Sequence, residues 1–176
     1  RVWFDKNKDT YLKAKENFDS FITDLLGSIA VFDSGIKGLE AKNCVYRIYR
    51  DIRFSKDKTP YKTHFSAGIT TGGKNAYAPG YYLHVAPGKS VLAGGIWMPP
   101  PPQLVAIRQE IDYSAKEFRK ILSAKDFKKY FGKLDQDYKL QTTPKGYAKE
   151  HPEIEFLKLK SFIVVHNMKD KDVLAK

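Results

Sequence analysis

The sequence has little sulfur and a shortage of acidic residues. Its one cysteine is Cys44, and 20 Asp and Glu residues stand against 31 Lys and Arg residues, which leaves a formal net charge of +11. A single cysteine excludes an internal disulfide and a zinc site built from several cysteines. It is typical of a reducing compartment, so we expect a cytoplasmic location.

Long hydrophobic runs are also absent. No apolar stretch approaches the ~20 residues that cross a bilayer, and the sequence therefore predicts no membrane-spanning helix. Hydrophobic residues nevertheless make up 42% of the 176-residue chain, which is enough for a real core. We find no internal repeat and no low-complexity linker. We expect a single α+β domain over residues 1–176, with a small, mostly antiparallel sheet packed against several helices.

Apolar periodicity predicts a long first helix. Apolar residues recur every seven positions from Phe4 to Leu25, so we expect a helix from Asp5 to Leu26 that ends at Gly27. Runs rich in β-branched and aromatic residues predict four strands, over 63–70, 80–86, 89–97 and 159–166, and 138–142 is a further strand candidate. Further helices are expected over 102–111, from 114 onward and over 125–131.

The predicted strands place two features of interest. Tyr82 and His84 alternate with apolar neighbours, so both side chains should lie on one face of their strand. Gly94 and Gly95, inside the third strand, indicate close approach of another backbone or a ligand. Residues 45–52 fit either a strand with a mixed face or a helix with an apolar stripe, and we predict a short helix there.

Positive charge is concentrated in two segments. Residues 42–64 hold seven Lys and Arg against two Asp, and residues 116–133 hold seven Lys and Arg against one Glu and one Asp. Each segment therefore carries +5, and together they account for +10 of the +11. Lys dominates 116–133, which favours a solvated helix surface. The arginines of 42–64 favour a binding site, because guanidinium groups fork onto phosphate or carboxylate oxygens.

The segment 47–62 supplies the candidate ligand-binding residues. We expect the cationic side chains to contact an anionic, phosphate-bearing ligand and Tyr61 to help orient the arginines. The candidates are Arg47, Arg50, Arg53, Lys58, Tyr61 and Lys62. An internal network is the alternative, with Arg47 paired to Asp51 and Arg53 paired to Asp57.

Candidates for proton transfer are few. His84 is the first, because its pKa near 6.5 suits acid–base chemistry, and Asp51 is the second. His64 lies next to the basic segment and is ambiguous. The spacing of His and carboxylate residues predicts no metal site, and neither a serine-nucleophile motif nor a phosphate-binding glycine loop is present. We therefore expect no cofactor.

The run from Arg47 to Tyr61 resembles a family signature. It contains eight marked positions: Arg47, Arg50, Asp51, Arg53, Phe54, Asp57, Lys58 and Tyr61. With the stretches 82–88, 94–99, 107–111 and 144–147, it is similar to the bacterial Domain of Unknown Function 2461 family over nearly the whole chain. The resemblance implies a cytoplasmic single-domain protein and supplies no activity, substrate or catalytic residue. Family members are somewhat longer, so we expect this sequence to be trimmed at both ends.

Four functional hypotheses follow. The first is a binding domain for an anionic small molecule at 47–62. The second is an enzyme that acts on a phosphorylated substrate in the same pocket, with His84 or Asp51 as the proton-transfer group. The third is a nucleic-acid-binding protein that uses residues 42–64 and 116–133 as one surface. The fourth is a structural or protein-interaction domain in which the charged segment is an internal brace.

Overall fold

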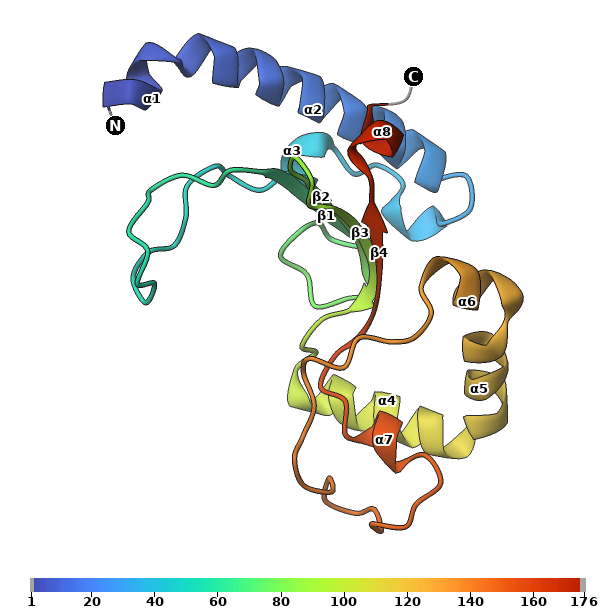
Figure 1. Cartoon of the computed structure of the whole chain (residues 1–176). Helices are drawn as coiled ribbons and strands as arrows, with labels where there is room; N and C mark the ends of the chain where they lie inside the picture. Colours follow the sequence, from blue (N-terminus) through green and yellow to red (C-terminus); the bar gives the residue numbers. More distant parts are fainter. Residues whose placement is uncertain (1, 175–176) are drawn as a thin grey trace. The chain divides into compact units, whose positions relative to one another are not determined.

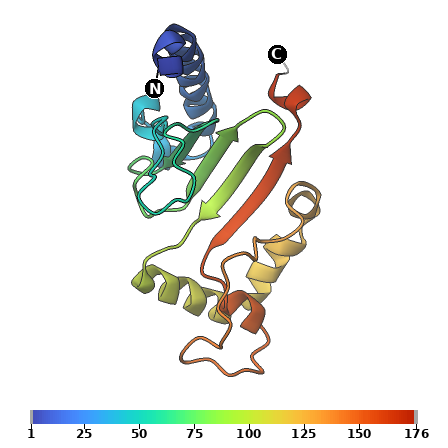
Figure 2. The same cartoon turned by 60° about the vertical axis from the view of Figure 1, so that its left-hand side comes forward.

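A four-stranded sheet with the order β1-β2-β3-β4 connects the helices of the chain (Figures 1 and 2). The structure is a computed structural model and describes residues 2–174. The strands are antiparallel and span Phe65–Thr70 (β1), Gly80–Val85 (β2), Ser90–Ile96 (β3) and Phe162–Met168 (β4). All four predicted strands are present, with boundaries within a few residues of those expected. The α+β class is therefore confirmed.

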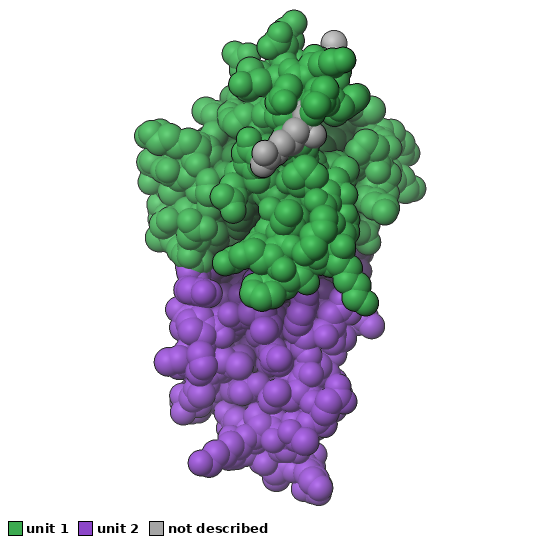
Figure 3. All heavy atoms as spheres, turned by 90° about the vertical axis from the view of Figure 1, so that its left-hand side faces the viewer, with its two compact units in different colours: residues 1–76, 80–92, 167–176 green, residues 77–79, 93–166 purple. Residues whose placement is uncertain are grey.

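The chain divides into two compact units, which Figure 3 colours separately. Unit 1 comprises residues 1–76, 80–92 and 167–176, and unit 2 comprises 77–79 and 93–166. Unit 1 contains the helices α1 (Val2–Lys6), α2 (Lys8–Ile29), η1 (Ser34–Ile36), α3 (Ala41–Cys44) and α8 (Asp170–Val173). Unit 2 contains α4 (Pro101–Tyr113), α5 (Ala115–Ser123), α6 (Lys125–Tyr130) and α7 (Ile154–Leu157).

The core of unit 1 lies between α2 and one face of the β1-β2 pair. The buried residues of α2 are Phe18, Ile22, Leu26 and Ile29, which repeat at helical spacing. They belong to one cluster with Ala67, Ile69 and Leu83, the inward residues of the two strands. Burying each large apolar side chain stabilises the fold by about 1.5–3 kcal/mol, so this contact is a main source of stability for unit 1.

The predicted end of the first helix is wrong. Gly27 lies inside α2, which continues to Ile29 because Ile29 is buried in the same core. Phe21, an apolar residue of the same helix, is 51% exposed. Burial of the next turn therefore outweighs the tendency of glycine to end a helix.

The predicted helix over 45–52 is also wrong. Val45 pairs with Ala67 and Tyr49 pairs with Tyr61 as antiparallel bridges, so the segment is extended. The partners are 22 and 12 residues further along the chain, which follows from 67 − 45 and 61 − 49. Pairing over such distances competes with local periodicity and here prevails.

The glycine pair in β3 is placed as expected. Gly95 has φ +118°, and a Cβ atom at this position would lie 2.1 Å from the carbonyl oxygen of Phe162. The close approach comes from the backbone of β4, one of the two partners that the sequence allowed. The pair therefore has a structural role in the sheet.

Two glycines with open space around the missing Cβ should respond oppositely to alanine. Gly27 lies in a helix, and we expect Gly27→Ala to raise the free energy of unfolding by about 0.5–1 kcal/mol. Gly38 has φ +82°, and we expect Gly38→Ala to lower it by about 1 kcal/mol because an L side chain is strained there. Urea unfolding of both variants measures the difference, and equal shifts would contradict the assignment.

Candidate functional site

Residues 45–64 form a two-stranded ribbon that we call the basic arm. Three cross-strand backbone hydrogen bonds hold it: Tyr46 N to Ser66 O at 2.9 Å, Lys62 N to Ile48 O at 2.8 Å and Arg50 N to Pro60 O at 2.9 Å. The ribbon leaves the edge of the sheet beside β1 and extends away from it, in cyan to turquoise in Figure 1. The arm thus gives a rigid backbone to the segment that the sequence singles out.

Ion pairs brace the tip of the arm. Arg50 pairs with Asp57 across the loop, and its Nη1 also donates to the Thr59 carbonyl oxygen at 3.3 Å. Lys58 Nζ donates to the Ile52 carbonyl oxygen at 2.9 Å, which closes the loop from the other side. These side chains therefore hold the shape of the loop, and the two ion pairs expected from the sequence, Arg47–Asp51 and Arg53–Asp57, are not formed.

Asp51 is engaged by Arg53 instead. Arg53 Nη2 donates to Asp51 Oδ2 at 2.7 Å, Arg53 Nε donates to Oδ1 at 3.0 Å, and the Arg53 backbone N–H donates to Oδ1 at 3.2 Å. The side-chain and backbone hydrogen bonds from Arg53 lower the pKa of Asp51 to about 2. The Thr59 hydroxyl and N–H, followed by Arg50, likewise lower the pKa of Asp57. A lowered pKa makes a carboxylate a weaker proton acceptor, so Asp51 is a poor general base near neutral pH.

Tyr61 anchors the arm to the helical layer of unit 1. Its ring stacks on Phe4 of α1 with centroids 4.2 Å apart and lies 5.6 Å from the ring of Tyr49. Its role is therefore packing rather than orientation of the arginines.

The outer face of the sheet, opposite the α2 core, carries the polar side chains of β1 and β2. In the register, Ser66 lies opposite His84 and Gly68 lies opposite Tyr82. The ring of Tyr46 covers Gly68, since a Cβ there would lie 2.8 Å from the Tyr46 hydroxyl oxygen. This hydroxyl donates to the Lys74 carbonyl oxygen at 3.1 Å. Gly68 thus makes room for a tyrosine that the sequence analysis did not single out, and a glycine within a strand is the signal that could have indicated it.

Lys62, His64, Tyr82 and His84 gather beside Tyr46, and we call these five residues the outer-face cluster. The rings of His64 and His84 stack with centroids 4.1 Å apart, and the Tyr82 hydroxyl lies 3.4 Å from Nδ1 of His84. Lys62 Nζ lies 5.4 Å from the centroid of the Tyr46 ring. Of the predicted residues, Lys62 and His84 are therefore brought to one face of unit 1, together with His64.

Burial shapes the electrostatics of this cluster. Desolvation, followed by the charge of Arg47, lowers the pKa of Lys62. Desolvation also lowers the pKa of His84, and it lowers that of His64 together with the charges of His84 and Lys62. No salt bridge within residues 2–174 includes Lys62 or the exposed Arg47. The cluster is thus cationic and lacks a carboxylate partner among the described side chains.

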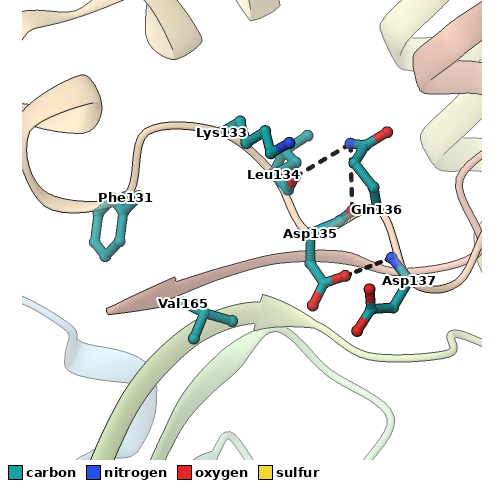
Figure 4. Close-up of a pocket in the computed structure, with 7 residues that line it drawn as sticks. All are labelled: Phe131, Lys133, Leu134, Asp135, Gln136, Asp137 and Val165. Atoms are coloured by element: carbon teal, nitrogen blue, oxygen red, sulfur yellow. Dashed lines mark hydrogen bonds between the residues drawn. The ribbon is translucent and has the colours of Figure 1, made fainter. Parts of the chain in front are cut away.

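The second basic segment lies in unit 2, on α5 and α6, whereas the arm belongs to unit 1. Unit 2 also has a hollow between residues 133–137 and β4 (Figure 4). Two of its polar side chains make local hydrogen bonds: Asp135 Oδ1 accepts from the Asp137 N–H at 2.6 Å, and Gln136 Nε2 donates to the Leu134 carbonyl oxygen at 3.1 Å. The hollow contains none of the residues predicted from the sequence.

Metal-ligating groups and membrane-spanning helices bear on the kind of site. Among residues 2–174, no group of three or more His, Cys, Asp or Glu side chains is arranged to hold a metal ion. No helix in the same range has the length and apolar character needed to cross a membrane.

The histidine pair predicts how stability depends on pH. The folded pKa of both imidazoles lies below the ordinary value of about 6.5, so between the two values the unfolded chain binds more protons. Stability should therefore be complete above pH ~6.5 and decline as the pH falls below it. We expect His84→Asn to reduce this decline, measured as urea midpoints at about pH 7.5 and about pH 5.5. His166→Asn, on β4 and outside the pair, is the control, and an unchanged decline in His84→Asn would contradict the prediction.

Comparison with known proteins agrees with the resemblance noted in the sequence. Searches of curated proteins and of solved structures found no match. One family, described as "Conserved hypothetical protein (DUF2461)", matches residues 1–176, the whole chain. The protein therefore belongs to the DUF2461 family of conserved hypothetical proteins.

Proposed function

We propose that unit 1 is a binding domain for a phosphate-bearing anion, which it holds at the outer-face cluster. The observation that carries this proposal is Lys62, a half-buried ammonium group that no salt bridge in the described part of the chain includes. Partial burial of a cation without a counter-ion costs free energy. A bound anion removes this cost, and phosphate oxygens suit an ammonium group flanked by imidazole and hydroxyl donors.

The neighbouring side chains supply further contacts for such a ligand. His64 and His84 offer ring N–H donors, and the Tyr82 hydroxyl lies next to His84. Arg47 is exposed and adds positive charge near Lys62. Arg50, Arg53 and Lys58 keep the arm in shape and so act through position rather than through direct contact.

The state of the single cysteine supports a cytoplasmic location. The one cysteine, Cys44, is a free thiol buried in the core of unit 1. Free thiols persist most readily in a reducing compartment.

Inorganic pyrophosphate titration by calorimetry tests the proposal. We expect Lys62→Gln to weaken pyrophosphate binding by about tenfold or more, because a hydrogen bond to a charged group contributes about 1.5–3 kcal/mol. Lys89→Gln, an exposed lysine in the turn between β2 and β3, is the matched control and should bind like the original protein. Pyrophosphate binding that is equal in both variants, or absent from the original protein, would contradict the proposed anion site at Lys62.

An enzyme that acts on a phosphorylated substrate is the second candidate. The stacked His64 and His84 pair favours it, because a lowered pKa leaves an imidazole unprotonated near neutral pH and able to accept a proton. Asp51 is less suited, since the hydrogen bonds from Arg53 lower its pKa and make its carboxylate a weak proton acceptor.

A panel of phosphate monoesters separates the two candidates. If the protein is an enzyme, His84→Asn should abolish turnover of a monoester such as p-nitrophenyl phosphate and affect pyrophosphate affinity far less. Absence of turnover in the original protein across the panel would exclude the enzyme and leave the binding domain as the remaining candidate.

A further inference from the structure

The tip of the basic arm carries a highly exposed aromatic ring. Phe54 is 94% exposed, and the guanidinium carbon of Arg53 lies 5.8 Å from the centroid of its ring. Tyr49, further down the ribbon, is 54% exposed. Large exposed aromatic side chains within a cationic segment mark binding surfaces more often than scattered surface residues do.

The loop around Phe54 is already held in its shape. Asp51 bonds to the backbone and side chain of Arg53, just before the ring, and Asp57 Oδ1 accepts from the Thr59 N–H at 2.9 Å just after it. The cross-loop contacts of Arg50 and Lys58 connect the two sides. A preformed loop loses little conformational entropy on binding, so the exposed ring can serve as a fixed platform.

The charge of the arm suits an extended polyanion. Residues 45–64 hold six Lys and Arg against two Asp, a local +4, and both aspartates are paired within the arm. Within residues 2–174, no salt bridge includes Arg47, Lys56 or Lys62. These cations are distributed along the ribbon from its base to its tip, and a ligand that uses all of them must be an extended polyanion such as a chain of phosphates.

We propose that the phosphate-bearing ligand of unit 1 is single-stranded nucleic acid, with a base stacked on Phe54 and backbone phosphates at Lys56, Arg47 and Lys62. This inference rests on the proposed function for the phosphate contact at Lys62. Single strands combine the two properties that the arm matches, a negative backbone and unstacked flat bases. An anionic membrane fits less well, because Phe54 is flanked by Arg53 and Ser55 and one apolar side chain is too little for stable anchoring.

Fluorescence anisotropy with a labelled single-stranded oligothymidylate of about 20 nucleotides tests the inference. We expect Phe54→Leu to weaken binding by about tenfold, a stacking contribution equivalent to ~1.4 kcal/mol, and Phe54→Tyr to restore it. Tyr113→Leu, a 92% exposed aromatic residue on α4, is the matched control and should bind like the original protein. Affinity should fall steeply between about 50 and about 200 mM salt, because phosphate contacts release counter-ions.

Parallel titrations separate this inference from the proposed function. Phe54→Leu should leave pyrophosphate binding unchanged, whereas Lys62→Gln should weaken both ligands. Pyrophosphate binding without oligothymidylate binding would overturn the inference and leave the proposed function intact. Equal affinity for inorganic polyphosphate, unaffected by Phe54→Leu, would show a response to charge alone and also overturn it. So would Phe54-dependent binding to phosphatidylserine vesicles in place of the oligonucleotide.

Discussion

Backbone pairing within the basic arm is the constraint on which the candidate site depends. Because Tyr49 pairs with Tyr61 and the Lys62 N–H donates to the Ile48 carbonyl oxygen, the chain is extended and alternate side chains lie on opposite sides. Lys62 lies beside the ring of Tyr46, and His64, just before β1, stacks on His84. A helix over 45–52 would remove these cross-strand pairs and, with them, the extended backbone that brings Lys62 beside Tyr46.

The charged residues of the arm divide into two groups with different roles. Arg50 and Arg53 are neutralised by Asp57 and Asp51, and such exposed ion pairs contribute little to the free energy of unfolding. Their value lies in geometry, because the Arg50 pair connects the two sides of the loop and the Arg53 pair fixes the turn on one side of it. Lys62 belongs to the other group, in which positive charge is partly desolvated and unbalanced by any described carboxylate. In the proposed function, a bound anion supplies the counter-charge for that group.

Proton binding and anion binding are coupled at the outer-face cluster. The stacked imidazoles favour the neutral form in the folded protein, and a phosphate beside them would favour the protonated form. Anion affinity in the proposed function therefore increases as the pH falls, in the range where the folded chain alone loses stability. Protonation of these two histidines thus lowers the stability of the free protein and, in the proposed function, strengthens anion binding.

The four strands could be predicted from the sequence to within a few residues, and so could the presence of a long first helix, though not its ends. Alternation along residues 80–86 correctly separated the inward Leu83 from Tyr82 and His84, because side chains in a strand point to opposite faces. The density of charge and aromatic residues between 44 and 62 also singled out the segment that forms the basic arm, since composition alone shows where positive charge is not balanced.

Only the tertiary structure decided how that charge is used. Long-range pairing made residues 45–64 a ribbon, and the loop geometry matched Arg50 to Asp57 and Arg53 to Asp51, partners that helical spacing would not join. Burial of Ile29 extends α2 beyond Gly27. Tyr46 packs over Gly68 and so lies against the sheet within the outer-face cluster. Each of these outcomes depends on contacts between residues distant in the chain, whereas periodicity reports only on neighbours.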